Sequence, residues 1–285
     1  MSPHQIVQIV SIVMLVALML DAGMQTNREH LLAALRNFGL LARALLANFV
    51  IVPIVGVLIA RVFQLDAAIA TGVLLMTIAP GVPFLVRAAG RQPGGSLGFA
   101  VALTFILPAL SVVTIPITAH FVLPLGARAH LPLAQFLTTL VLFQLVPLLI
   151  GLLVSYRAPA LAMRLDLPLT IVFAVAVGTL LTMSFLVIVK SVSGVYGSRA
   201  MLAELCIVLL CIGTGWLLGG PEVPYRRTLS IATTLRNVGL CSLIAATAFP
   251  ASLAEASVCT YFIVQFIIVI IFRMLFHRAA QTASA

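Results

Sequence analysis

The sequence predicts an all-α polytopic membrane protein of about nine transmembrane helices, built as an inverted repeat whose two interrupted helices cross near the midplane. Three observations predict this fold. Of the 285 residues 62% are apolar and only 8% are charged, the mean hydropathy is +1.23, and the apolar residues form long unbroken runs. Soluble domains are roughly 45–50% apolar and about 25% charged. The composition therefore excludes a soluble fold and predicts a single transmembrane domain over residues 1–285.

Each apolar run is long enough to cross the hydrocarbon core as a helix, which takes about 20 residues. The runs do not alternate as the shorter strands of a membrane barrel do. Only His4 precedes the first run as a basic residue, so we expect a retained helix there and not a cleaved leader. The expected helices cover residues 6–24, 38–60, 67–89, 97–123, 131–154, 167–189, 201–219, 227–248 and 255–276.

The basic residues predict the orientation in the cell membrane. With nine helices, 11 of the 16 lie in connectors or near helix ends on one side: Arg28, Arg36, Arg43, Arg87, Arg91, Arg157, Arg164, Arg226, Arg227, Arg273 and Arg278. Four lie on the other side: Arg61, Arg128, Lys190 and Arg199. The positive-inside rule then places the N-terminus outside and the C-terminus in the cytoplasm. Because these residues form no basic stripe, the net charge of +9 indicates a lipid bilayer and not nucleic acid as the partner.

Two runs differ from the others. The third contains Ala79-Pro80-Gly81-Val82-Pro83, and two prolines within four residues remove backbone donors and clash with preceding carbonyls. The eighth places Arg236 and Asn237 near its centre, where a charged side chain costs about 2.5–3.5 kcal/mol and is a candidate functional residue. Alternatively, the prolines only kink a helix, and Arg236 pairs with a carboxylate such as Asp21 or Glu204.

The two unusual runs occupy matching places in the chain. We divide it into half-repeats at residues 6–123 and 131–276; with the fifth run set aside, runs one to four correspond in order, and in opposite orientation, to runs six to nine. Interrupted segments at corresponding positions of inverted halves indicate a transporter's midplane binding site.

Other polar residues lie near the centres of helices. Asn48 and Thr104 are taken as site residues, whereas Gln144 and Gln265 are assigned to hydrogen bonding between helices. The four cysteines, Cys206, Cys211, Cys241 and Cys259, are interpreted as small buried hydrophobic residues. No nucleophile, metal-protease or phosphate-loop motif is present, so we expect no enzyme activity, no cofactor and no metal site.

Four stretches together resemble the bile acid:sodium symporter family. Ala22-Gly23-Met24 is similar to the family's Met-Gly-Leu, and Asn48-Phe49-Val50-Ile51-Val52-Pro53 to Gln-Phe-x-x-x-Pro. Ala79-Pro80-Gly81 lies in the interrupted third run, and Arg236-Asn237-Val238-Gly239-Leu240 is similar to Gln-Asn-x-Gly-Leu. Their order and spacing hold over nearly the whole chain. The resemblance implies inverted repeats of five helices, one helix of which this chain lacks, and a panel domain beside a core domain that contains the crossing helices.

The resemblance also implies a set of sodium ligands, and this chain departs from it. The family's Glu and Gln on the second broken helix fall on Ala232 and Arg236, and its Ser-Asn pair falls on Leu85 and Val86. Its Gln on the second run becomes Asn48, and Thr104 retains one hydroxyl. The resemblance argues for sodium coupling, but the lost carboxylate and the added guanidinium argue against it. We give more weight to the residues.

These observations predict a secondary transporter that moves a small organic anion by alternating access. Arg236 offers planar donors suited to a carboxylate or sulfonate, and half-helix N-termini add partial positive charge. The expected substrate-binding residues are Arg236, Asn237, Thr233, Thr234, Pro80, Gly81, Asn48 and Thr104. Coupling to sodium, to protons or to neither stays open. The alternatives are a channel, or a non-transporting membrane protein such as a sensor or assembly subunit.

Overall fold

The structure, a computed structural model, confirms an all-α membrane fold. It describes residues 3–26, 28–81, 85–86, 88, 94–128, 133–191, 198–250 and 252–282, and no strand lies within these ranges. Seven helical segments there are long and apolar enough to cross a membrane: Gln5–Met24, Phe38–Val62, Leu97–Val122, Phe136–Arg157, Pro159–Thr182, Arg199–Leu218 and Leu253–Leu275. Two shorter apolar helices, Ala67–Ile78 and Val238–Ala248, belong to the runs predicted to be interrupted. A total of nine crossings stays a prediction.

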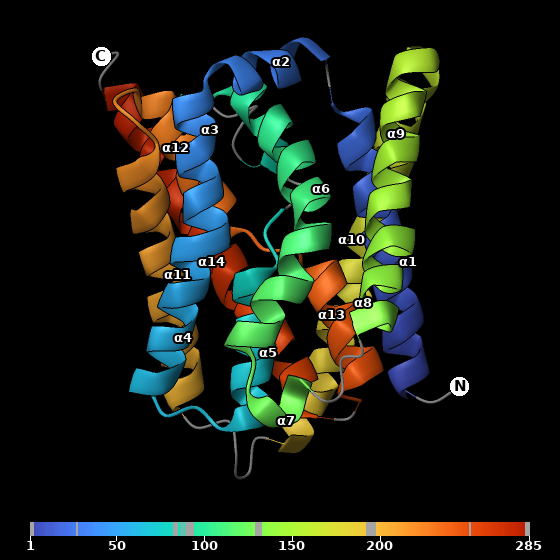
Figure 1. Cartoon of the computed structure of the whole chain (residues 1–285), viewed down its shortest axis with the longest axis vertical. Helices are drawn as coiled ribbons and strands as arrows, with labels where there is room; N and C mark the ends of the chain where they lie inside the picture. The colour runs from blue at the N-terminus through green and yellow to red at the C-terminus, as the bar shows by residue number, and fades with distance from the viewer. Residues whose placement is uncertain are drawn as a thin grey trace.

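Five long helices stand side by side in Figure 1: α1 (Pro3–Met24), α6 (Leu97–Val122), α10 (Pro159–Ser191), α11 (Ser198–Leu218) and α14 (Leu253–Thr282). The first of them begins at one end of the molecule, and the last ends at the opposite end (Figure 1). Pro108 and Pro116 lie inside α6, and Pro168 lies inside α10. Interior prolines are tolerated in membrane helices because neighbouring groups hydrogen-bond to the freed carbonyls.

Two other membrane-spanning segments each contain a π-helical turn. One consists of α3 (Phe38–Leu46), η1 (Ala47–Ile51) and α4 (Val52–Val62), and the other of α8 (Leu133–Leu140), η3 (Val141–Leu145) and α9 (Val146–Arg157). In both, a proline is the second residue after the π turn, Pro53 or Pro147. Proline has no N–H, so the regular hydrogen-bond ladder fails in the turn before it. Such π turns often occur at functional sites, and each of these two carries one buried amide side chain, Asn48 or Gln144.

Two connectors form helices that the sequence did not predict. Helix α2 (Arg28–Arg36) lies across one end of the molecule (Figure 1), and α7 (Leu125–Arg128) is a single turn at the other. Glu29 in the first turn of α2 and Arg36 in its last turn suit the helix dipole. Too polar to cross the membrane, α2 joins α1 to α3 along the surface.

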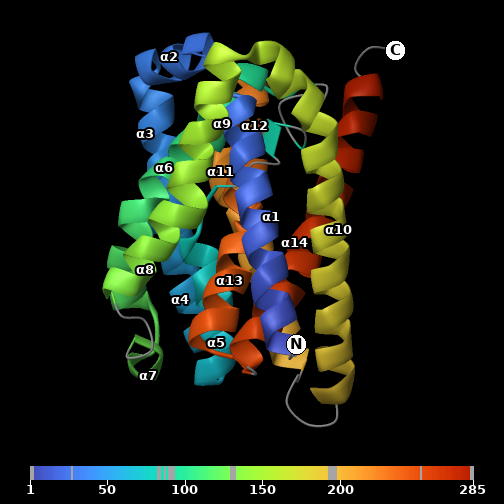
Figure 2. The same ribbon diagram turned by 90° about the vertical axis from the view of Figure 1, so that its right-hand side faces the viewer.

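Helix α1 packs between α9 and α10, with α13 (Val238–Ala248) beside it (Figure 2). The backbones of α1 and α9 touch at two glycines. A Cβ atom on Gly23 would overlap with the Leu148 carbonyl oxygen, and one on Gly151 would overlap with the Leu20 carbonyl oxygen. Small residues that let helix backbones approach closely are characteristic of packing inside membranes.

A candidate anion site at the crossing of two broken helices

The two interrupted helices meet at their breaks. Helix α5 (Ala67–Ile78) ends just before Pro80, and Leu235–Asn237 separate α12 (Val223–Thr234) from α13. Pro80 and Arg236 form an antiparallel backbone bridge, and the Asn237 N–H donates a hydrogen bond of 3.1 Å to the Ala79 carbonyl oxygen. Both predicted interruptions and their crossing are thus confirmed. The rest of the proline motif, Val82 and Pro83, lies outside the described residues.

Local chemistry explains each break. The Asn237 side chain caps α13, because its Oδ1 accepts a hydrogen bond of 3.2 Å from the Leu240 N–H. Gly81 has a φ of +104°, which other residues rarely adopt, and a Cβ atom there would lie 2.7 Å from Cγ of Pro108. The first break therefore packs directly against the proline in α6.

Arg236 is the only arginine within the described ranges that is fully buried, at 1% exposure. Its Nη2 donates a hydrogen bond of 2.5 Å to the Thr233 carbonyl oxygen at the end of α12, and its backbone N–H donates to Oε1 of Gln265 at 3.1 Å. Within the described ranges no hydrogen bond of ordinary geometry reaches its Nε or Nη1, although the Cys211 thiol lies close enough to interact with the guanidinium. Across the described ranges no carboxylate forms an ion pair with Arg236, so the alternative pairing with Asp21 or Glu204 does not occur. The crossing therefore holds a buried cation that forms no ion pair with a carboxylate in these ranges.

Thiol and phenol groups surround this cation. Arg236 interacts electrostatically with Cys211 on α11, with Cys241 on α13 and with Tyr261 on α14. All three side chains are buried, and the Tyr261 hydroxyl interacts with the Cys211 thiol without a hydrogen bond of ordinary geometry. From the sequence the cysteines were interpreted as inert core residues. Their position beside Arg236 had no signal in the chain, since each lies in an ordinary apolar run.

Gln144 is the residue that the sequence interpretation undervalued. From the π turn η3, its Nε2 donates to the Pro108 carbonyl oxygen at 2.7 Å and to Oγ of Ser111 at 2.6 Å. Its Oε1 accepts from Nδ2 of Asn237 at 3.3 Å. Gln144 thereby connects the fifth run to the crossing and to the proline in α6. A signal for this existed, because Gln144 precedes a proline much as Asn48 does.

The structure places the remaining predicted site residues in different settings. Thr233 donates from Oγ1 to the Cys211 carbonyl oxygen at 2.7 Å, and Thr234 to the Ser230 carbonyl oxygen at 2.7 Å, so both hydroxyls are already used. In contrast, Oδ1 of Asn48 and Oγ1 of Thr104 are buried without a partner. Within the described ranges, no hydrogen bond links Asn48 or Thr104 directly to the crossing. The residues brought together are Pro80, Gly81, Arg236 and Asn237.

Three of the positions that the resemblance matches to sodium ligands, Leu85, Val86 and Ala232, carry buried apolar side chains. Leu85 and Ala232 belong to one buried hydrophobic cluster that also contains Ala44, Leu103 and Leu107. The part of the chain that the structure describes contains no group of three or more His, Cys, Asp or Glu side chains arranged for a metal ion. Methyl groups cannot replace the oxygen ligands that a hard cation needs.

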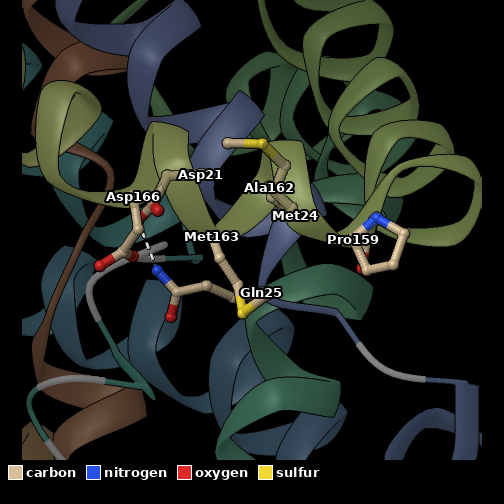
Figure 3. Close-up of a pocket in the computed structure, with 8 residues that line it drawn as sticks. Asp21, Met24, Gln25, Pro159, Ala162, Met163 and Asp166 are labelled. Carbon is tan, nitrogen blue, oxygen red and sulfur yellow. Dashed lines mark hydrogen bonds between the residues drawn. The ribbon is translucent and has the colours of Figure 1, made fainter.

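A separate cavity of about 340 Å³ lies between α1, α9 and α10 (Figure 3). It is lined by Asp21, Met24, Gln25, Ser155, Pro159, Ala162, Met163 and Asp166. Its Gln25 amide donates to Oδ2 of Asp21 at 2.6 Å, drawn as the dashed line in Figure 3. None of the predicted site residues lines it, and the two carboxylates make it unsuitable for an anion.

Comparison with known proteins agrees with this architecture. The profile of the sodium bile acid symporter family matches residues 12–197. P3 protein of Homo sapiens is 27% identical over 203 residues, covering 68% of this chain and 41% of that protein. P3 protein of Bos taurus is 27% identical over 142 residues, or 48% of this chain and 29% of that protein. The chain thus spans less than half the length of these curated relatives. By its crossing helices and by this match over most of its length, the chain belongs to the sodium bile acid symporter family.

Proposed function

We propose that this protein is a secondary transporter that moves a small organic anion by alternating access, without sodium coupling. The observation that supports this most directly is the guanidinium of Arg236, which is buried at the crossing and forms no ion pair with any carboxylate in the described part of the chain. Leaving a permanent charge unpaired in a low-dielectric interior is costly, so a ligand of opposite charge stabilises it. A carboxylate or sulfonate matches the planar donors of an arginine.

The electrostatics of the crossing support an anion further. Helix α13 begins at the break, and its N-terminus carries partial positive charge, as broken helices at transporter midplanes do for anionic substrates. A cavity lined by two carboxylates is separate from the crossing and is bordered by α1, α9 and α10. An anion therefore finds positive charge at the crossing and negative charge in the cavity.

We infer the absence of sodium coupling from the residues that stand at the positions of the family's sodium ligands. Leu85 and Ala232 are packed in an apolar cluster, and Arg236 adds a positive charge where a ligand oxygen stands in coupled relatives. We place the protein in the cell membrane with its N-terminus outside and its C-terminus in the cytoplasm, because of the distribution of the basic residues.

Purified protein in detergent tests the proposal through a thermal-shift screen of small carboxylates, sulfonates and bile acids, each in sodium chloride and in potassium chloride. An anion at 100 times its Kd adds about 2.7 kcal/mol to the folded state, and we expect the same shift in either salt. Uptake of that anion into proteoliposomes should be saturable and show counterflow, which separates a carrier from a channel or a sensor. Uptake that strictly requires sodium would refute the proposal that transport is independent of sodium.

A further inference from the structure

Glu204 is a second buried ionisable side chain, and it is not one of the residues proposed to bind the anion. It lies in the second turn of α11 with 0% exposure, on the face that packs against α14. Its Oε1 accepts a hydrogen bond of 2.8 Å from Oγ1 of Thr260, while its Oε2 has no partner. An ionisable side chain within a membrane span is expensive to bury and marks ion or proton pathways more often than structure.

In the part of the chain that the structure describes, no cation forms an ion pair with this carboxyl group. Tyr261 and Thr260 approach it from α14, and Cys211 lies two helical turns along its own helix. The other charged residues on its own helix and on the helices packed against it are Arg199, Arg43, Arg61, Arg226, Arg227, Arg236, Glu255 and Arg273; Arg278, near the end of α14, lies outside the described side chains. Within the described ranges none of them forms an ion pair with Glu204. A buried carboxylate without a cation is destabilising by several kcal/mol, and the addition of a proton removes that penalty.

The hydrogen-bond geometry accommodates both protonation states. When Glu204 is ionised, Thr260 donates its single hydroxyl hydrogen to Oε1. When Glu204 is protonated, its own hydrogen can point to the oxygen of Thr260, whose hydrogen then turns to the Ser257 carbonyl oxygen at 3.1 Å. Both states keep the hydrogen bond between Glu204 and Thr260 by reorienting hydrogens alone, because a hydroxyl both donates and accepts.

Glu204 is also connected to the crossing. Tyr261 interacts electrostatically with Glu204, with Cys211 and with Arg236, so one phenol lies near both the carboxyl group and the buried cation. A change in the charge of Glu204 therefore alters the field at Arg236 through an interior where charges are poorly screened.

We propose that Glu204 binds and releases one proton in each transport cycle and thereby couples a proton gradient to anion movement; this inference rests on the proposed function. The carboxylate takes a proton from hydronium, leaving water, when the site opens to the more acidic side. It returns that proton to water on the other side. When Glu204 is protonated it is neutral, and the negative charge of the bound anion compensates the positive charge of Arg236.

Infrared difference spectroscopy tests the proton site without any substrate. Wild-type protein in lipid should show the C=O stretching band of a protonated carboxyl group that disappears when the pH is raised across the titration range. Glu204→Gln should lack that band, whereas the matched exposed-acid control Glu222→Gln should retain it. Thr260→Val should shift its frequency, because one hydrogen bond is lost. If the wild-type spectrum shows no titrating band, or if Glu204→Gln keeps it, the proposal is wrong.

Coupling is tested with labelled taurocholate, whose sulfonate stays ionised over this range, so that any pH effect belongs to the protein. An inward proton gradient should raise its accumulation in wild-type and Glu222→Gln proteoliposomes, while Glu204→Gln should lose the gradient response but keep counterflow. Equal gradient responses in the wild type and Glu204→Gln would overturn the coupling. If no variant carries taurocholate although the band titrates, the transport proposal fails for this anion and the proton site stands.

Discussion

The backbone N–H of Asn237 donates a hydrogen bond of 3.1 Å to the carbonyl oxygen of Ala79, joining the two broken helices at their crossing. A carbonyl freed by a helix break needs such a partner at bilayer depth. The next residue back, Arg236, is thereby fixed beside Pro80 with its guanidinium in the interior. The four predictions below test what this arrangement implies.

Replacing Arg236 with glutamine should abolish the thermal stabilisation by anions, while the protein remains folded and at least as stable. The change removes one hydrogen bond to Thr233, worth about 1 kcal/mol, and also removes a buried unpaired charge. Arg61→Gln, which removes the same charge from an exposed position, should leave anion binding unchanged. A loss of roughly 3–5 kcal/mol of stability in Arg236→Gln would instead indicate a structural ion pair.

Gln144 and Asn237 should be energetically coupled. Gln144→Leu leaves the Asn237 amide and the Pro108 carbonyl with fewer partners, and each unsatisfied buried group costs about 1–3 kcal/mol. Asn237→Ala also removes the cap of α13, at about 1 kcal/mol. In a double-mutant cycle measured by thermal unfolding, we expect a coupling of about 0.5–3 kcal/mol. Strict additivity would show that the contact contributes nothing.

Gly151→Ala should loosen the contact between α1 and α9. Its new methyl group would overlap with the Leu20 carbonyl oxygen, and such overpacking typically costs about 1–3 kcal/mol. Gly178→Ala on α10 is the matched control, since nothing lies within 4 Å of a Cβ atom there. That control should be neutral or gain about 0.5–1 kcal/mol from helix propensity. Similar unfolding temperatures for both variants would contradict the close approach of the two backbones.

Topology reporters fused at Ser2 and Ala285 should report opposite sides of the membrane, with Ser2 outside. The expectation follows from an odd number of crossings and from the excess of arginine on one side. Consistently, α1 begins at the end of the molecule opposite to where α14 ends (Figure 1). Reporters that give the same side would show that the helix count is even.

Much of the fold followed from the sequence because the bilayer sets helix length and proline sets the breaks. The run around Pro80 could not continue as a helix, and the position of Arg236 ten residues into an apolar run marked the second break. The inverted order of these two runs predicted that they cross. These are local properties of the chain, so they are readable without coordinates.

Which side chains face one another was decided only by the tertiary structure. Helices that are apolar on every side, such as α5 and α13, have no periodicity that tells which face meets a neighbour. The contact of Gln144 with Asn237, and the placement of Cys211 beside Arg236, depend on helix rotation and register. Those are set by packing around glycines and prolines from distant parts of the chain. The same packing leaves Arg236 without an ion pair to a carboxylate in the described ranges. From the sequence alone, a pairing with Asp21 or Glu204 had stayed possible.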